Sequence, residues 1–256
     1  MSGGIRFMAE PVDVVCGRDL DGAPALLMDE VVERLEKPAA GGVRPWVARC
    51  ILRMGGWRVG GAPPNLCKYV IVAAPHTAWM DGVWMLAFAW YWGINLAWIG
   101  KASLAKGPLG WLTRRVGLIP VDRSAAQGLV AQIVEQFDKR DSLFLSIPPE
   151  GTRGKGSYWK SGFYQIARGA GVPICLSYLD YGVREAGFGP MIKTSDNIVA
   201  DMDRIRAFYK PEWARHPGLF TLPRLREESS IPMVSIEASN NLAVDMNGPL
   251  REVVQD

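Results

Sequence analysis

The fold is decided by residues 68–101, which read KYVIVAAPHTAWMDGVWMLAFAWYWGINLAWIGK. The apolar run Tyr69–Ala74 predicts a buried strand, and the apolar segment Met80–Trp92 predicts a buried helix. A glycine interrupts the pattern before a second apolar strand, Asn95–Lys101. The uncharged stretch Gly82–Gly100 is long enough to cross a membrane, but this interruption favours a helix followed by a strand inside a folded domain.

The same alternation continues along the chain. Further apolar strands are predicted at residues 118–121, 143–147 and 174–179, and further helices near residues 106–115, 124–139, 160–170 and 201–209. Nearly all-apolar strands that alternate with helices are typical of a mainly parallel sheet with both faces covered. We therefore predict an α/β fold, with a mainly parallel central sheet flanked by helices.

The two ends of the chain differ from this central region. We predict an N-terminal extension at residues 1–42, a domain at residues 43–216 and a C-terminal arm at residues 217–256. Within the extension, Pro24–Lys37 has the apolar spacing of a helix. The next segment, Val43–Trp57, combines apolar residues with three arginines. This pattern fits an amphipathic helix on an anionic membrane surface, or an ordinary packing helix with solvated arginines.

Charge is unevenly distributed, although the net charge is only +3. Residues 1–42 hold four basic and eight acidic side chains, whereas residues 43–123 hold ten basic and two acidic ones, a net charge of +8. Such a basic region favours an anionic partner: nucleic acid, a membrane surface or a phosphorylated substrate. The sequence has no motif that reads DNA or RNA, so we expect no nucleic-acid partner.

The cysteines do not suggest a metal site. They are Cys16, Cys50, Cys67 and Cys175, with no CxxC pair among them. We expect reduced, buried thiols, as in a cytoplasmic protein. The first residues lack the continuous apolar segment of a signal peptide.

The unusual polar residues fall in three turns that follow predicted strands: residues 75–81, 122–123 and 148–156. Ligands gather at the carboxyl ends of parallel strands, so we expect these turns to form one site. Histidine is suited to take a proton from an alcohol near neutral pH, and His76 stands in the first turn. Asp81 can orient it if His76 lies in the turn and Asp81 in the first helical turn.

The chain has no nucleophile elbow of the GxSxG type, which favours direct attack by an acceptor hydroxyl over a covalent intermediate. Its two distant histidines do not predict a metal site. The glycine-rich turn Glu150–Gly156 can present backbone N–H groups to an anion, and Arg153 and Arg123 can each add a bidentate guanidinium. These features predict a phosphate pocket beside a base.

Four segments resemble, in order, the four motifs of the glycerolipid acyltransferase family, which includes the 1-acylglycerol-3-phosphate acyltransferases. They are His76-x4-Asp81, GLIPVDR at 117–123, PEGTR at 149–153 and VPI at 172–174. The resemblance covers roughly residues 65–180. It implies a glycerol-3-phosphate acyltransferase-like fold, an acyltransferase domain at 43–216 and an O-acyltransferase of phospholipid biosynthesis.

The resemblance also implies residue roles. His76 is then the general base and Asp81 its partner. The acceptor phosphate is held by Arg123, Glu150, Gly151, Thr152 and Arg153, and the acyl pocket is shaped in part by Val172 and Pro173. Acyl-CoA or acyl carrier protein is the implied co-substrate, without a bound cofactor. A phosphate-bearing lysolipid is the implied acceptor, and a different hydroxylated lipid remains open.

Several alternatives stay open from the residues alone. The tryptophans after His76 favour core packing, but Trp84 and Trp98 could instead line an apolar slot for the acyl chain. A phosphoester hydrolase is disfavoured because it needs a nucleophile or clustered metal ligands. A non-catalytic lipid-binding module of the same fold remains possible. Lipid substrates lead us to expect a cytoplasmic protein, held peripherally on the inner face of the membrane through Val43–Trp57.

Overall fold

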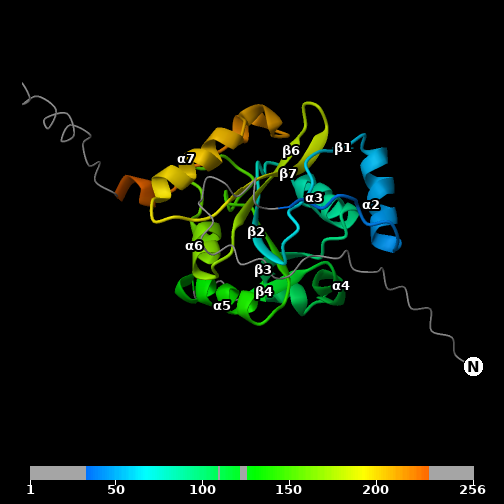
Figure 1. The fold of residues 1–256 in the computed structure, drawn as a ribbon, viewed down its shortest axis with the longest axis horizontal. Coiled ribbons are helices and arrows are strands. Elements are labelled where there is room, and N and C mark those ends of the chain that lie inside the picture. Colours follow the sequence, from blue (N-terminus) through cyan, green and yellow to red (C-terminus); the bar gives the residue numbers. More distant parts are fainter. Residues whose placement is uncertain (1–32, 109, 122–125, 231–256) are drawn as a thin grey trace, which may run out of the picture.

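The computed structural model describes residues 33–108, 110–121 and 126–230. A seven-stranded sheet forms its centre, in the order β1-β7-β6-β2-β5-β3-β4 (Figure 1). The strands are β1 (Arg58–Val59), β2 (Lys68–Ala73), β3 (Leu96–Lys101), β4 (Leu118–Val121), β5 (Leu143–Ile147), β6 (Ile174–Asp180) and β7 (Glu185–Ile192). All neighbouring strands run parallel except β6 and β7. The prediction of a mainly parallel sheet is confirmed.

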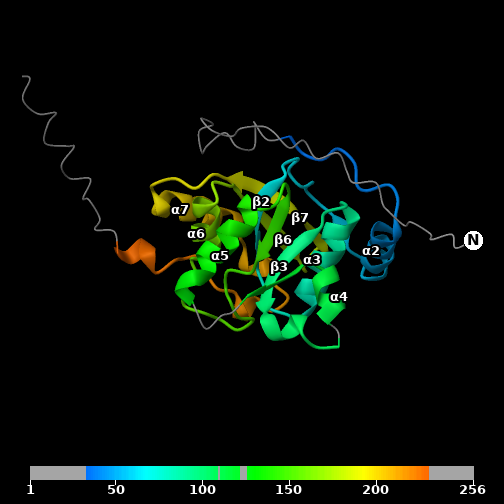
Figure 2. The same cartoon turned by 90° about the horizontal axis from the view of Figure 1, so that it is seen from below.

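Helices cover both faces of the sheet. They are α2 (Val43–Met54), α3 (Met80–Tyr91), α4 (Gly110–Arg115), α5 (Ala126–Asp138), α6 (Gly162–Gly169) and α7 (Ile198–Phe208). Helices α5, α6 and α7 lie on one face, and α3 with α2 outside it lies on the other (Figures 1 and 2). Successive side chains of β2 point to opposite faces of the sheet, so this strand contributes to the hydrophobic core on each face. Val70 and Val72 join the core under α5–α7, whereas Tyr69 and Ile71 join the core under α3.

The uncharged stretch 82–100 divides into a helix and a strand, α3 and β3, as predicted. Gly93, with a φ of 75°, makes the turn between them. Among the described residues, no helix has both the length and the apolar character needed to cross a bilayer.

Three local predictions differ from the structure. Residues 33–37 are not helical, because Arg34 forms a β-bridge with Pro64 instead; the earlier part of the predicted helix lies outside the described residues. The helix predicted near 106–115 shortens to α4, preceded by the 3-10 turn Ala102–Ala105, since a glycine and a proline stand between them. Cys50 and Cys175 form no disulfide, but Cys67 is disulfide-bonded, so the expectation of a reduced thiol is wrong there.

Helix α2 packs on α3 and turns two of its arginines toward the protein. Arg44 donates to the Asn95 side chain and to the Arg115 carbonyl, both at 2.8 Å. Arg49 donates to the carbonyl groups of Ala39 and Ala40, at 2.9 and 3.4 Å. Arg44 and Arg49 are therefore half-buried and bonded to the protein rather than fully solvated, whereas Arg53 is exposed. The exposed side of α2 instead carries large apolar side chains, Val43, Trp46 and Met54.

The segment after α7 returns across the sheet toward the turn that follows β2. The Tyr209 hydroxyl donates to the Val72 carbonyl, and Phe220 and Leu225 are buried in the core under α5–α7. The His216 N–H donates to the Thr77 hydroxyl at 3.2 Å. The described part of the C-terminal arm, residues 217–230, is thus packed on the domain. The division into extension, domain and arm stays a prediction.

Candidate active site

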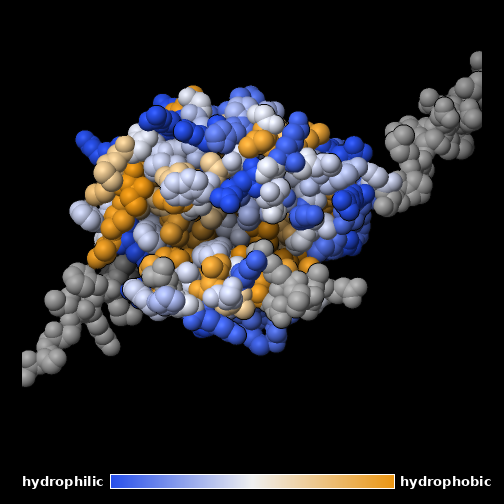
Figure 3. All heavy atoms as spheres, turned by 180° about the vertical axis from the view of Figure 1, so that it is seen from behind, coloured by the Kyte–Doolittle hydropathy of each residue, from blue (hydrophilic) through white to orange (hydrophobic). Residues whose placement is uncertain are grey.

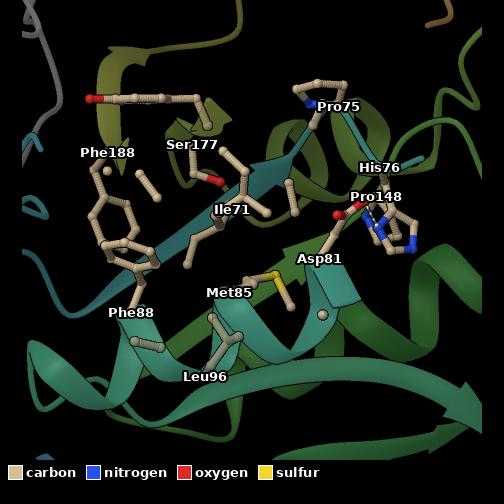
Figure 4. Close-up of a pocket in the computed structure, with 18 residues that line it drawn as sticks. Ile71, Pro75, His76, Asp81, Met85, Phe88, Leu96, Pro148, Ser177 and Phe188 are labelled. Atoms are coloured by element: carbon tan, nitrogen blue, oxygen red, sulfur yellow. Dashed lines mark ion pairs between the residues drawn. The ribbon is translucent and has the colours of Figure 1, made fainter. Parts of the chain in front are cut away.

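His76 and Asp81 lie at the carboxyl end of β2, where the chain turns into α3. His76 stands in the turn, and Asp81 is the second residue of the helix. The Nδ1 atom of His76 lies 3.3 Å from Oδ2 of Asp81 (Figure 4, dashed line). The turn therefore brings the two side chains together as the sequence predicted. Since Nδ1 faces the carboxylate, the other imidazole nitrogen, Nε2, remains available for a substrate proton.

Hydrogen-bond donors hold the Asp81 carboxylate, which is only 3% exposed. Its Oδ2 atom accepts from the N–H groups of Thr77 and Ala78, both at 2.8 Å, and its Oδ1 atom accepts from the Tyr181 hydroxyl at 2.6 Å. Burial alone raises the pKa of Asp81, but hydrogen bonds from His76, Tyr181 and the backbone outweigh it and hold this pKa below its usual value. Asp81 therefore stays ionised beside the imidazole.

Tyr181 is a site residue to which no sequence pattern points. It lies in the turn between β6 and β7, 100 residues after Asp81. Its ring packs edge-on against Trp57, with centroids 5.1 Å apart, and the Arg215 guanidinium lies 5.5 Å from its centroid. Burial and the adjacent Asp81 raise the pKa of the Tyr181 hydroxyl, which keeps it a donor at neutral pH. Only the folded chain identifies it.

Glu150 fixes the other side of the histidine turn. Its Oε1 atom accepts from the His76 N–H at 2.9 Å, and the residue is 5% exposed. Its Oε2 atom has no hydrogen-bond partner among the described residues. Burial raises the pKa of Glu150, because a charged carboxylate is poorly solvated there. This placement differs from the predicted contact with a phosphate, since a buried carboxyl bound to the backbone of the histidine turn is a poor anion site.

Residues 151–155 of the glycine-rich loop are exposed, and the first three of them line the same groove as His76. Gly151 adopts a φ of 66°, which a side chain would strain, and it lets the loop turn over Lys160. The side chains of Thr152 and Arg153 line a wide groove together with His76. The structure therefore brings Arg153 and the loop to the imidazole. Arg123 lies outside the described residues.

An apolar cavity opens beside His76 and runs between α3 and the sheet. His76 and Asp81 lie at one end of it, and Phe88 and Phe188 lie at the other (Figure 4). Its walls include Ile71, Met85, Phe88, Leu96, Leu179 and Phe188. Apolar walls with a polar end suit the hydrocarbon part of a ligand whose reacting group lies at the imidazole.

The four residues predicted to shape an acyl pocket do not line this cavity. Trp84 packs against Trp57 instead, with ring centroids 5.3 Å apart. Trp98 lines the wide groove and donates from its indole N–H to the Val116 carbonyl. Val172 and Pro173 precede β6, at the end of the sheet opposite His76, because β6 and β2 run parallel. Of the four, only Trp98 lies near the imidazole groove.

The wide groove connects the elements of the site. It passes from the loop at Arg153, past His76, to Trp79 and Val83 on α3 and on to Trp98. Figure 3 shows the molecule from the side opposite to Figure 1, with a hollow across its middle that has hydrophobic residues in its depth. Within the described ranges, no group of three or more His, Cys, Asp or Glu side chains could hold a metal ion.

Comparisons with known proteins find similarity to acyltransferases over the region that holds this site. A family model described as Acyltransferase matches residues 64–176, which contain His76, Asp81 and the glycine-rich loop. The chain is similar to a lyso-ornithine lipid O-acyltransferase of Rhodobacter capsulatus, with 28% identity over 139 residues, or 51% of this chain and 49% of that protein. It is also similar to the 1-acyl-sn-glycerol-3-phosphate acyltransferase of Escherichia coli, with 37% identity over 89 residues, or 31% and 36% of the two chains.

The chain thus spans about half of the first curated relative and about a third of the second. Among solved structures it is similar to PlsC, a 1-acyl-sn-glycerophosphate (LPA) acyltransferase from Thermotoga maritima. That similarity has a TM-score of 0.42 and 16% sequence identity, and it covers 63% of this chain and 76% of that one. The family model matches the part of the chain that carries the four motifs.

Proposed function

We propose that this chain, whose residues 64–176 match a family model described as Acyltransferase, transfers an acyl chain from a thioester to the hydroxyl of a lysolipid. One observation carries the proposal: His76, paired with an ionised Asp81, lines both the apolar cavity and the groove that holds Arg153. A base at the junction of an apolar slot and a cationic loop suits two lipid substrates that meet there. Both curated relatives carry the names of enzymes that acylate lysolipids.

In the proposed reaction, His76 acts as general base. Nε2 takes the proton of the acceptor hydroxyl while the hydroxyl oxygen attacks the thioester carbonyl carbon. Asp81 stabilises the imidazolium that forms, because its negative charge lies next to Nδ1. When the carbonyl re-forms, the carbon–sulfur bond breaks and the thiolate takes the proton from His76. The products are an ester and a free thiol, and the enzyme returns to its starting state.

The acceptor phosphate is proposed to bind the exposed loop. Arg153 supplies a charged fork and Thr152 a hydroxyl and a backbone N–H, while Gly151 makes the turn that presents them, and Arg123 is proposed to add a second guanidinium. Glu150 has a different role in this proposal. It positions His76 by accepting the N–H of the histidine turn, which fixes the turn between Glu150 and Asp81.

The acyl chain of the thioester is proposed to enter the cavity under α3, whose free volume of about 60 Å³ must widen to hold a long chain. The cavity begins at His76, so a thioester carbonyl at its mouth lies next to the imidazole. Its far end is closed by Phe88 and Phe188, which sets a limit on chain length. Trp84 has no part in this proposal, because it packs against Trp57.

A membrane contact is proposed for the exposed face of α2, at the inner face of the membrane. Val43, Trp46 and Met54 are 55%, 63% and 81% exposed there, and the exposed Arg53 adds a positive charge. Apolar and aromatic side chains beside a cation are typical of an interfacial helix. Sedimentation with liposomes tests this contact: a Trp46→Ser, Met54→Ser variant should pellet less, and unchanged pelleting contradicts it.

The acceptor site is tested with Arg153→Ala and a panel of lysolipids with and without a phosphate. A hydrogen bond to a charged group contributes about 1.5–3 kcal/mol, so kcat/KM for phosphate-bearing acceptors should fall by about 10- to 150-fold. Acceptors without a phosphate should be affected far less. Arg58→Ala is the matched control, because Arg58 is exposed on β1 at the far edge of the sheet. An equal loss for both acceptor types would contradict the role of Arg153.

A further inference from the structure

A second concentration of positive charge lies away from His76, at the opposite end of the strands. Arg44, Arg114, Arg115 and Arg140 line one hollow beside the amino ends of β3, β4 and β5. Three of these residues fall in the segment 43–123, whose net charge of +8 already favours an anionic partner. The groove at His76 accounts for none of them.

The four arginines share the walls of this hollow with no carboxylate. No Asp or Glu lines the hollow, and none of these arginines forms an ion pair with another described residue. Arg44 is held by the Asn95 amide oxygen and the Arg115 carbonyl, and its guanidinium lies 5.6 Å from the centroid of the Trp90 ring. Burial and the positive charge of Arg115 lower the pKa of Arg44.

Such convergence is electrostatically unfavourable until an anion binds. Arg114 and Arg115 close the last turn of α4, where the helix dipole favours a cation by typically 0.3–1 kcal/mol. That local effect does not explain why Arg44, from α2, and Arg140, which follows α5, line the same hollow. Guanidinium groups are the usual partners of phosphate, because they present paired donors to two of its oxygens.

The hollow adjoins the groove at His76. Leu96 and Val116 belong to the walls of both. The two ends are separated by about the length of β5, Leu143–Ile147, which is roughly 17 Å at 3.3 Å per residue. A single extended ligand can therefore place a phosphate-bearing end among the arginines and a reacting carbonyl at the imidazole. A coenzyme A thioester has this form, with its phosphates separated from the thioester by the pantetheine arm.

We propose that the arginine hollow, formed by Arg44, Arg114, Arg115 and Arg140, binds the phosphate groups of a coenzyme A thioester. The inference rests on the proposed acyl transfer and names its donor. A phospholipid head group is the other source of the same chemistry, because Trp111 and Leu112 stand exposed on the same helix as Arg114 and Arg115. The experiment below separates the two sources.

The test measures binding without turnover. Free coenzyme A is titrated calorimetrically into wild type, into an Arg114→Gln, Arg115→Gln variant, and into an Arg58→Gln control. The same proteins are sedimented with vesicles of phosphatidylglycerol and of phosphatidylcholine. We expect the double variant to bind coenzyme A at least tenfold more weakly, because each lost charged contact contributes about 1.5–3 kcal/mol. Its binding to vesicles should match that of wild type and the control.

Each outcome decides the proposal. A loss for coenzyme A alone supports it. A loss of binding to phosphatidylglycerol vesicles, alone or together with a loss for coenzyme A, keeps a phosphate site but overturns its assignment to the donor, and no loss in either assay overturns the site. A His76→Ala protein should bind coenzyme A as wild type does. Failure of acyl transfer and failure of this site can therefore be distinguished, because binding is measured whether or not the protein turns over.

Discussion

Replacing Asp81 with Asn removes the negative charge beside His76 but keeps the shape of the side chain at position 81. An Asn side-chain oxygen can still accept the N–H groups of Thr77 and Ala78, and its amide can still donate to the Tyr181 oxygen. The imidazole should therefore keep its position. What the substitution removes is the attraction between the Asp81 carboxylate and the imidazolium that forms when His76 takes the substrate proton.

The 3.3 Å separation between Nδ1 and Oδ2 sets the size of the effect. With an effective dielectric constant of about 20, two unit charges at this distance attract each other by about 5 kcal/mol. Each 1.36 kcal/mol changes a rate tenfold, so the full loss would lower kcat by between about 10³- and 10⁴-fold. Because the His76 side chain is 24% exposed, solvent screening makes this an upper bound.

The assay is thiol release from an acyl thioester in the presence of a lysolipid acceptor, with single-turnover rates to isolate the chemical step. Asp138→Asn, on the exposed end of α5, is the control for an equal change of charge. Circular dichroism and thermal melting establish that the Asp81→Asn protein is folded. A folded Asp81→Asn protein with turnover within about threefold of wild type would refute the reasoning, because the calculated attraction would then have no role in the transition state.

Two further predictions concern the surroundings of the histidine. Tyr181→Phe removes a 2.6 Å hydrogen bond to the Asp81 carboxylate, so urea unfolding should show a loss of about 1.5–3 kcal/mol. Because Asp81 has a lowered pKa, it stabilises the fold above the usual carboxyl pKa, and this stability is lost as pH falls through the folded value. Tyr181→Phe should raise that folded pKa and move acid unfolding to higher pH; an unchanged acid midpoint contradicts the role of Tyr181. Gly82 lines both cavity and groove, with no atom within 4 Å of an added Cβ. Gly82→Leu should therefore obstruct long acyl chains and lower their turnover at least tenfold, without lowering the melting temperature, since Leu is the better helix former by up to about 1 kcal/mol. Gly82→Ala is the control for the helix, and a chain-length profile that stays the same in both variants contradicts the assignment of the cavity.

Continuous apolar runs separated by turn residues made the central fold predictable. Strands β2 to β6 are buried on both faces and read as continuous apolar runs, so their positions and the parallel arrangement follow from sequence alone. Strand β7 was missed because Gly187, Gly189 and Pro190 interrupt it, and these residues ordinarily mark turns. Its antiparallel pairing with β6 overrides that local preference.

The candidate site was predictable in its local parts only. His76, Asp81 and the loop at Arg153 follow strand ends, and parallel strands deliver such turns to one edge. Tyr181 comes from a turn 100 residues after Asp81, and no short-range spacing encodes that contact. Trp84, by contrast, was predicted to line the acyl pocket but does not line the cavity. The absence of a side chain at Gly55, where an added Cβ would lie 2.5 Å from the Trp84 ring, lets this tryptophan pack toward α2, away from the cavity.

The orientation of the arginines in α2 was also not predictable. An amphipathic pattern identifies a basic helix, but it does not reveal whether its arginines face solvent or donate to backbone carbonyl groups. Arg44 and Arg49 donate to carbonyl groups of other segments, which leaves the exposed face of α2 largely apolar. The proposed mode of membrane contact changes accordingly, from attraction by three arginines to insertion of apolar side chains.

The most direct test of the central claim compares thiol release by wild type and His76→Ala with acyl-CoA and a lysolipid acceptor. We predict acceptor-dependent release by wild type, lowered by about 10²–10⁴-fold in His76→Ala, with the melting temperature of the two proteins closely similar. Turnover close to that of wild type in a folded His76→Ala protein would contradict the account, because the proposed base would then be dispensable.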